Sequence, residues 1–139
     1  MEPSSQPAPQ YLFAYGTLQP GHAPPEIAAI VQHFETVGKG TVPGTLYDLG
    51  AYPGAVLDQA GSRFISGTVF RLPAGDDVLR RLDAYEEFDP QQPQRSLFLR
   101  RLYPVRLADG PTLNCWLYEY NGSLDHARII ESGPFVLRR

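Results

Sequence analysis

The sequence predicts an α+β domain: a small, mostly antiparallel β-barrel or strongly curved sheet with two or three packed helices. Three observations lead to this fold class. The 14 prolines and 13 glycines are spread along all 139 residues, which favours many short elements joined by tight turns. Most apolar segments between them have the composition or the two-residue alternation of strands. One segment, 76–86, instead spaces its apolar residues as a helix does.

The composition is typical of one globular domain. Hydrophobic residues make up 42% and charged residues 19%, and 139 residues can bury a core without disulfides or metals. The net charge of -3 argues against nucleic acid, and the lack of a long apolar run argues against a membrane. We expect a disordered tail over 1–10, with no secretory signal, and a single domain over 11–139. A single cysteine, Cys115, predicts no internal disulfide and a cytoplasmic location.

The first predicted elements are a strand and a short helix. Residues 11–16, YLFAYG, form an apolar aromatic run that ends in glycine, which predicts a buried strand followed by a sharp turn. Pro24 and Pro25 can open a helix that continues to about His33. Glycine and proline recur over 36–54, so we expect several short strand pieces there rather than one long strand.

A clearer strand and the main helix follow. The segment 64–72, FISGTVFRL, alternates its side chains between two faces. The period then changes, because the next apolar residues recur at helical spacing: Val78, Leu79, Leu82 and Tyr85. Asp76 is the expected N-cap of this helix, and Pro90 prevents its continuation.

The last predicted elements form a β-hairpin. Strands over 97–107 and 112–120 flank Asp109-Gly110, a turn in which glycine tolerates positive φ. The second strand has apolar side chains on both faces, so we expect it to be central and covered on both sides. We expect the C-terminal segment, 131–139, to be a loop.

Glu86 is the candidate for chemistry that the predicted helix supplies. Val78, Leu82 and Glu86 are spaced i, i+4, i+8, so Glu86 continues the core-facing ridge. Glu87 instead falls on the polar face with Asp83. Burial near aromatic side chains would raise the pKa of the Glu86 carboxyl, as a general acid/base near neutral pH requires. The alternative is a frayed helix end that leaves Glu86 in water.

The turn after the first strand is a second candidate. Tyr15, Gly16, Thr17 and Leu18 can present consecutive backbone N–H groups, which would bind a carboxylate or another anion without a basic side chain. The alternative is an ordinary turn between a strand and a loop.

Other candidate residues indicate less. The three histidines have no metal-ligand spacing: His22, His33 and His126. Cys115 lies mid-strand, where a packed core thiol is expected rather than a nucleophile. Arg100 and Arg101 are adjacent on a strand and therefore point to opposite faces. One of them could meet a carboxylate inside the fold, with Glu86 the candidate, and we expect the other in solvent.

A series of short segments is typical, in its order and spacing, of one known family. The segments are FAYGTL (13–18), LYDLGAYPGAV (46–56), GTVFRL (67–72), LDAYEEF (82–88), LFLRRLYPV (97–105), CWLYEY (115–120) and IESGPF (130–135). Through them the chain resembles the gamma-glutamylcyclotransferase-like family, in its gamma-glutamylamine cyclotransferase and bacterial cyclotransferase-like branch. The resemblance implies that family's fold and spans nearly the whole chain beyond residue 10.

The resemblance also implies roles for individual residues. The substrate's α-carboxylate and α-amino end would lie on the backbone of four consecutive residues: Tyr15, Gly16, Thr17 and Leu18. Glu86 matches the catalytic acid of the family's D-x-x-E segment. Tyr118, or less favourably Tyr120, would line the pocket. Two departures concern the substrate: Glu87 stands where the family often has a small residue, and Phe98 stands where the family has a tyrosine.

The implied reaction is an intramolecular cyclisation. The α-amine of a γ-glutamyl group attacks its own side-chain carbonyl, which yields 5-oxoproline and a free amine or amino acid. Such a cyclising lyase needs no metal, cofactor or nucleophile, and its partner is a small γ-glutamyl compound. The alternative is a module of the same fold that binds a small carboxylate or a peptide end without turnover. A buried Glu86 facing the ligand favours the enzyme, because a mere binder does not need it.

Overall fold

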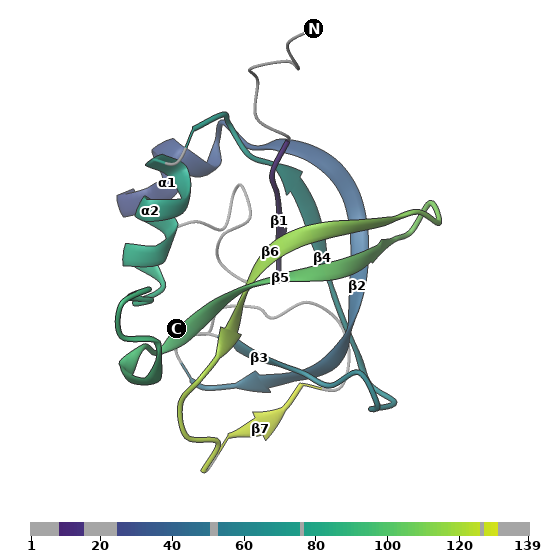
Figure 1. Ribbon diagram of the computed structural model, residues 1–139. Helices are drawn as coiled ribbons and strands as arrows, with labels where there is room; N and C mark the ends of the chain where they lie inside the picture. The colour runs from purple at the N-terminus through teal and green to yellow at the C-terminus, as the bar shows by residue number, and fades with distance from the viewer. Residues whose placement is uncertain (1–8, 16–24, 51–52, 76, 126, 131–139) are drawn as a thin grey trace, which may run out of the picture.

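The computed structural model describes residues 9–15, 25–50, 53–75, 77–125 and 127–130. Its strands are β1 (Tyr11–Ala14), β2 (Glu35–Asp48), β3 (Pro53–Leu57), β4 (Phe64–Arg71), β5 (Phe98–Leu107), β6 (Thr112–Tyr120) and β7 (Arg128–Ile129). Its helices are α1 (Pro25–Val31), α2 (Asp77–Tyr85) and a 3₁₀ turn (Pro93–Arg95). Figure 1 shows α1 and α2 together on one side of the strands.

Five strands close into a barrel. β1 pairs with β4, β4 with β2, β2 with β5 and β5 with β6, all antiparallel. β6 closes the ring through a parallel contact with β1, where Leu12 lies opposite Trp116. β3 bridges β2 and β6, and β7 pairs with β2. The structure therefore confirms the predicted small, mostly antiparallel barrel with packed helices.

β2 is a single strand of 14 residues, and the expectation of short pieces over 36–54 is wrong. Its glycines allow close approach rather than ending the strand. A Cβ on Gly40 would lie 2.7 Å from the Val105 side chain, and one on Gly44 would lie 2.6 Å from the Val56 carbonyl oxygen. Figure 1 shows β2 curving around the barrel, with β4 and β5 as partners at different points. Strand glycines at such bends are typical of closed sheets.

The alternation of side chains along the strands creates two cores. One fills the barrel and includes Phe13, Val69 and Cys115. The other lies between the barrel and the helices and includes Leu12 and Leu82. β6 contributes to both cores, which confirms the prediction of a central strand covered on both faces. The Cys115 thiol is fully buried, as predicted, and its burial raises its pKa to about 12.

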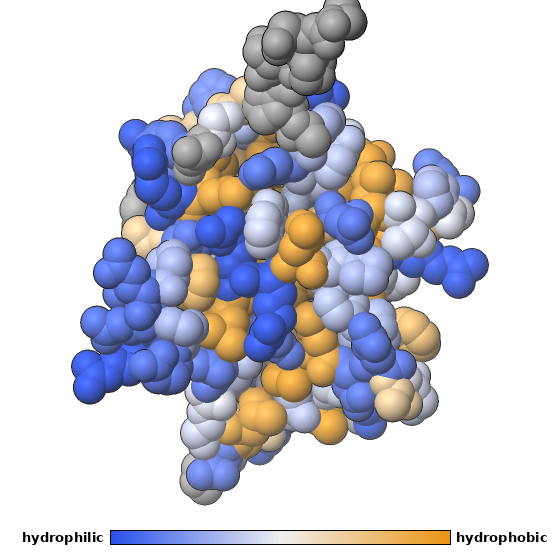
Figure 2. All heavy atoms as spheres, viewed as in Figure 1, coloured by the Kyte–Doolittle hydropathy of each residue, from blue (hydrophilic) through white to orange (hydrophobic). Residues whose placement is uncertain are grey.

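The structure confirms the predicted main helix and the predicted β-hairpin, with bounds close to those expected. α2 ends at Tyr85, one residue before Glu86, and buries Leu82. On its outer side, at the left of Figure 2, polar side chains predominate. Gly110 takes a φ of +114° in the predicted turn between β5 and β6. The predicted N-cap Asp76 and the C-terminal segment 131–139 lie outside the described residues.

Two further details bear on the chain outside the barrel. The Gln10 carbonyl accepts a hydrogen bond from the Leu72 N–H at 2.9 Å, so Gln10 is tied to the residue that follows β4. β7 and the 3₁₀ turn are too short to have left a periodic signal in the sequence.

No helix in the described part of the chain has the length and apolar composition needed to cross a membrane.

Candidate functional site

The end of α2 fixes where Glu86 lies. The Glu86 N–H donates to the Leu82 carbonyl at 2.9 Å, the last α-helical hydrogen bond. Glu87 then turns into the left-handed region at φ 56°, and its N–H donates to Ala84. The Phe88 N–H reaches back to the Asp83 carbonyl at 2.8 Å, which completes a Schellman motif. Glu86 is therefore the helix C-cap, one full turn beyond Leu82 on the core-facing ridge.

Glu87 occupies a position that favours glycine. A non-glycine residue in the left-handed region costs about 1–2 kcal/mol, and glycine at such a position avoids this cost. We expect Glu87→Gly to raise the free energy of unfolding by about 0.5–1 kcal/mol, after the greater unfolded-state entropy of glycine is subtracted.

Ala84 offers the matched control for that substitution. It is exposed, lies inside the same helix and takes ordinary helical dihedrals. Ala84→Gly should therefore lower the free energy of unfolding by about 1 kcal/mol. Urea denaturation of both variants against the unchanged chain measures the two effects. A loss of stability in both variants would mean that the left-handed conformation of Glu87 carries no strain.

The Glu86 carboxyl has the acidity of a general acid/base near neutral pH. Its side chain is partly buried, and this burial, with a smaller contribution from the charge of Glu87, raises its pKa to about 8. The hydroxyls of Tyr15 and Tyr118 have raised pKa values as well, chiefly because they are buried. The charge of Glu86 contributes to both increases, so both tyrosine hydroxyls lie within electrostatic reach of the Glu86 carboxyl.

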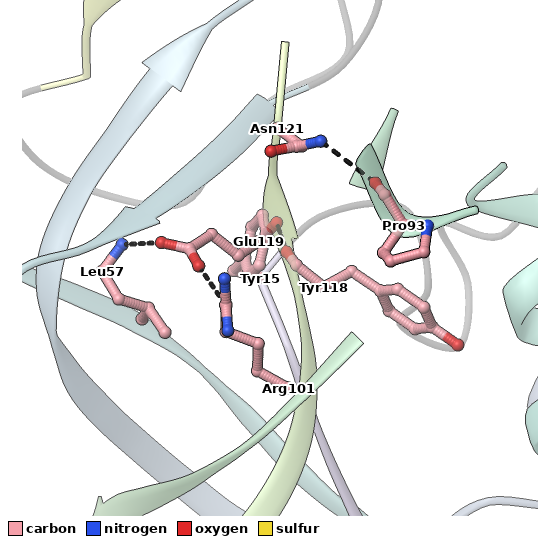
Figure 3. A network of polar contacts seen from close by, with 7 residues as sticks. All are labelled: Tyr15, Leu57, Pro93, Arg101, Tyr118, Glu119 and Asn121. Atoms are coloured by element: carbon pink, nitrogen blue, oxygen red, sulfur yellow. Dashed lines mark hydrogen bonds and ion pairs between the residues drawn. The ribbon is translucent and has the colours of Figure 1, made fainter. Parts of the chain in front are cut away.

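Hydrogen bonds hold the two tyrosines in place. The Tyr15 hydroxyl donates to the Tyr118 carbonyl and accepts from the Ala55 N–H at 3.3 Å. The Tyr118 hydroxyl donates to the Asp83 carboxylate at 2.8 Å. Figure 3 shows the Tyr118 side chain leaving β6 on the opposite side from Glu119. Tyr118 therefore points toward α2, whereas the Tyr120 hydroxyl donates to the Ser123 carbonyl at 3.1 Å.

Asp83 is buried, and its predicted place on the polar face with Glu87 is wrong. Its side chain pairs with Arg100, with 2.9 Å between Oδ1 and Nε. Arg100 is thus the arginine that meets an internal carboxylate, and the carboxylate is Asp83 rather than Glu86. Helical spacing alone misses such a residue, because a charged side chain reads as solvent-facing unless its partner on another strand is known.

Arg101 also has a partner, although we expected it in solvent. It is half exposed and pairs with Glu119 at 2.5 Å on the other face of the hairpin. The second oxygen of Glu119 accepts from the Leu57 N–H at 2.8 Å, which ties β6 to β3 (Figure 3). The two arginines do point to opposite faces, as the strand geometry predicts.

Three of the predicted substrate-binding residues, Gly16, Thr17 and Leu18, lie outside the described residues. Their role therefore stays a prediction. Tyr15, the residue immediately before them, is buried and within electrostatic reach of Glu86. The structure thus places Tyr15 and Tyr118 near Glu86. It adds Asp83, which the sequence placed on the polar face, and gives Arg100 to Asp83 rather than to Glu86.

Ionisation of Glu86 is expected to make the folded chain less stable as the pH rises. The folded pKa of about 8 lies above the ordinary 4.5, so its protonated form contributes stability that is fully present below about pH 4.5. That contribution is lost as the pH rises through about 8. One pKa unit corresponds to about 1.4 kcal/mol. After a discount for the partial exposure of the side chain, we expect the free energy of unfolding to fall by at least about 1 kcal/mol over this pH range.

The Glu86→Gln variant tests this linkage, because glutamine does not ionise. We expect its free energy of unfolding to exceed that of the unchanged chain at about pH 9 and to approach it near pH 4.5. Urea denaturation of both chains across this range provides the measurement. A difference between the two chains that stays constant with pH would show that Glu86 keeps its ordinary pKa in the fold.

Comparison with known proteins places this chain among related sequences. The family model described as "Gamma-glutamyl cyclotransferase, AIG2-like" matches residues 12–137. The "Gamma-glutamylcyclotransferase family protein YtfP" of Escherichia coli is 31% identical over 93 residues, which cover 67% of this chain and 68% of that protein.

Two solved structures share the fold. An AIG2-like protein of Mus musculus matches with a TM-score of 0.67 and 19% identity, over 90% of this chain and 88% of that one. YkqA of Bacillus subtilis matches with a TM-score of 0.66 and 19% identity, over 92% of this chain and 40% of that one. The family match over nearly the whole chain, together with this shared barrel, shows that the protein belongs to the gamma-glutamyl cyclotransferase, AIG2-like family.

Proposed function

We propose that this protein is a cyclotransferase that converts a γ-glutamyl amine, amino acid or peptide to 5-oxoproline and a free amine. One observation carries the proposal beyond family membership. The Glu86 carboxyl, with a pKa of about 8, lies within electrostatic reach of two buried tyrosines, Tyr15 and Tyr118. A carboxyl of ordinary acidity is almost fully ionised at neutral pH and is a poor proton donor there.

The reaction needs two proton transfers. The α-nitrogen of the γ-glutamyl group forms a bond to its own γ-carbonyl carbon, and the bond from that carbon to the leaving nitrogen breaks. The ionised Glu86 carboxylate takes a proton from the attacking amine, and the resulting carboxylic acid gives a proton to the leaving nitrogen. A pKa near neutrality lets one group perform both steps in sequence.

The remaining task of the protein is to fold the substrate into its reactive conformer. Attack within one molecule avoids the entropic cost of bringing two reactants together. We propose that the backbone of residues 15–18 holds the α-carboxylate and that Tyr118 contacts the α-amine. Tyr15 and Tyr118 lie within electrostatic reach of Glu86, the proposed acid/base at the end of α2. We propose that the reaction uses no metal or cofactor, so turnover should withstand a chelator.

A panel of γ-glutamyl compounds tests the proposed function. The panel includes glutathione, γ-glutamyl amino acids, γ-glutamyl-ε-lysine and γ-glutamyl alkylamines. We expect at least one compound to yield 5-oxoproline and free amine in equal amounts, above the rate without protein. Heat-denatured protein is the blank. Tight binding of a panel member without 5-oxoproline would identify the chain as a binding module instead.

A further inference from the structure

Asp83, Tyr118 and Arg100 form a buried group beside Glu86. The Asp83 Oδ1 accepts the Tyr118 hydroxyl at 2.8 Å and lies 2.9 Å from the Arg100 Nε. The exposed fraction of the side chain is only 9% for Asp83 and 18% for Arg100. Asp83 lies one helical turn before Glu86, so this group and the candidate acid/base share the same end of α2.

Arg100 is held from several sides. Its guanidinium lies 4.6 Å from the centre of the Trp116 ring and 6.0 Å from that of Phe88. These cation–π contacts and the ion pair with Asp83 fix the arginine in one orientation. Burial raises the pKa of Asp83, and the hydrogen bond from Tyr118 and the Arg100 cation act in the opposite direction by favouring the ionised carboxylate.

The geometry at Asp83 determines the direction of the hydrogen bond to Tyr118, because the same oxygen, Oδ1, faces both the Tyr118 hydroxyl and the Arg100 cation. A carboxylate can only accept hydrogen bonds, so the Tyr118 hydroxyl must donate its single proton to Asp83. The phenolic oxygen then has only lone pairs to offer to any further group. Tyr118 is also fixed through its main chain, because its carbonyl accepts the hydroxyl of Tyr15.

We propose that Asp83 is a positioning residue that holds the Tyr118 hydroxyl as a hydrogen-bond acceptor for the substrate's α-amine. This inference rests on the proposed function. An α-ammonium or α-amine has N–H groups to donate, so an oxygen that offers only lone pairs is its complement. One N–H donates to Tyr118, and the proton that must leave points toward Glu86. When the bound group is the α-ammonium, transfer of that proton to Glu86 frees the nitrogen lone pair for attack on the γ-carbonyl carbon.

Replacing Asp83 with asparagine tests the direction of the hydrogen bond. The amide of Asp83→Asn offers N–H donors as well as an oxygen, so the Tyr118 hydroxyl is no longer confined to donating toward α2. Loss of a hydrogen bond to a charged group corresponds to about 10- to 100-fold in affinity. We expect an increase of this size in KM, with kcat changed much less, for Asp83→Asn and for Tyr118→Phe.

The double variant separates positioning from general destabilisation. If Asp83 acts through the Tyr118 hydroxyl, adding Asp83→Asn to Tyr118→Phe should change kcat/KM by less than about twofold. If the loss of kcat/KM in the double variant equals the product of the losses in the two single variants, the proposal is overturned, because Asp83 then acts independently of that hydroxyl. Tyr118→Phe changes a single oxygen, so it keeps the test decisive should Asp83→Asn fold poorly.

A binding experiment in Glu86→Gln protein tests the same proposal without turnover. Its probes are γ-glutamylalanine and γ-glutamyl-ε-lysine, each with its glutaryl counterpart, which lacks the α-amine. By calorimetry we expect the amine-bearing probe to bind about 10-fold or more tightly than its counterpart, and Asp83→Asn to abolish this preference. A preference that survives Asp83→Asn would overturn the proposal. If the preference requires Asp83 but the unchanged chain, with Glu86 in place, releases no 5-oxoproline from any compound of the panel, the proposed function is refuted and the positioning role stands.

Discussion

Glu86→Gln is expected to lower the turnover of a γ-glutamyl substrate by about 10²–10⁴-fold, the usual contribution of general acid–base catalysis. Glutamine keeps the shape of the side chain and its hydrogen-bonding capacity but cannot accept and return a proton. The loss should therefore appear in kcat, while the binding of substrate and the folded state survive. Steady-state kinetics with a compound that the unchanged chain cyclises, together with thermal melting, measure both effects.

Glu87→Gln is the matched control for that experiment. It removes a carboxylate from the adjacent residue, which is exposed and does not continue the core-facing ridge. We expect turnover to stay within a few-fold of the unchanged chain. If Glu87→Gln is inactive and Glu86→Gln is active, the acid/base is Glu87 and the site must be assigned again.

The pH dependence of kcat/KM is a second test of Glu86 as the acid/base. The free protein needs Glu86 ionised to act first as a base, so kcat/KM should rise with pH through the Glu86 pKa of about 8. The charge of Glu87 contributes to that raised pKa. In Glu87→Gln the rise should therefore shift to lower pH. A profile that does not respond to Glu87 would mean that another group controls the observed ionisation.

Periodicity in the sequence was sufficient to predict where Glu86 and β6 lie in the fold. The i, i+4, i+8 ridge of α2 placed Glu86 at the core-facing end of the helix, and β6 was predicted as central from its two apolar faces. The resemblance of segments to a known family then supplied roles for Glu86, Tyr15 and Tyr118. Both tyrosines lie within electrostatic reach of Glu86, and the roles themselves stay predictions.

The rest of the site depends on contacts that no single segment encodes. Asp83 reads as a polar-face residue until the β5 strand brings Arg100 against it from 17 positions further along the chain. The continuous, curved strand β2 could not be predicted from its own segment either. Gly40 and Gly44 indicate a break in a strand unless the strands that approach them closely are known. Such tertiary contacts override local patterns, and they appear only once the barrel has closed.

Arg100→Met should lower the free energy of unfolding by about 3 kcal/mol at pH 8, because removing one partner leaves Asp83 as a buried carboxylate without its cation. Methionine retains much of the aliphatic contact with Trp116. Arg101→Met is the matched control on the same strand. Arg101 is half exposed where it pairs with Glu119, so we expect a loss of about 1 kcal/mol or less.

The dependence of this loss on pH identifies its cause. Arg100 is one of the contacts that lower the pKa of Asp83, so its removal raises that pKa further above the unfolded value. A group with a raised folded pKa loses stability as the pH increases through that pKa, so Arg100→Met should be less damaging at about pH 5 than at pH 8. Adding Asp83→Asn should recover part of the stability at pH 8, since no buried charge then remains. An equal loss at both pH values, with no recovery in the double variant, would assign the effect to the cation–π packing of Arg100 on Trp116 instead of to the ion pair.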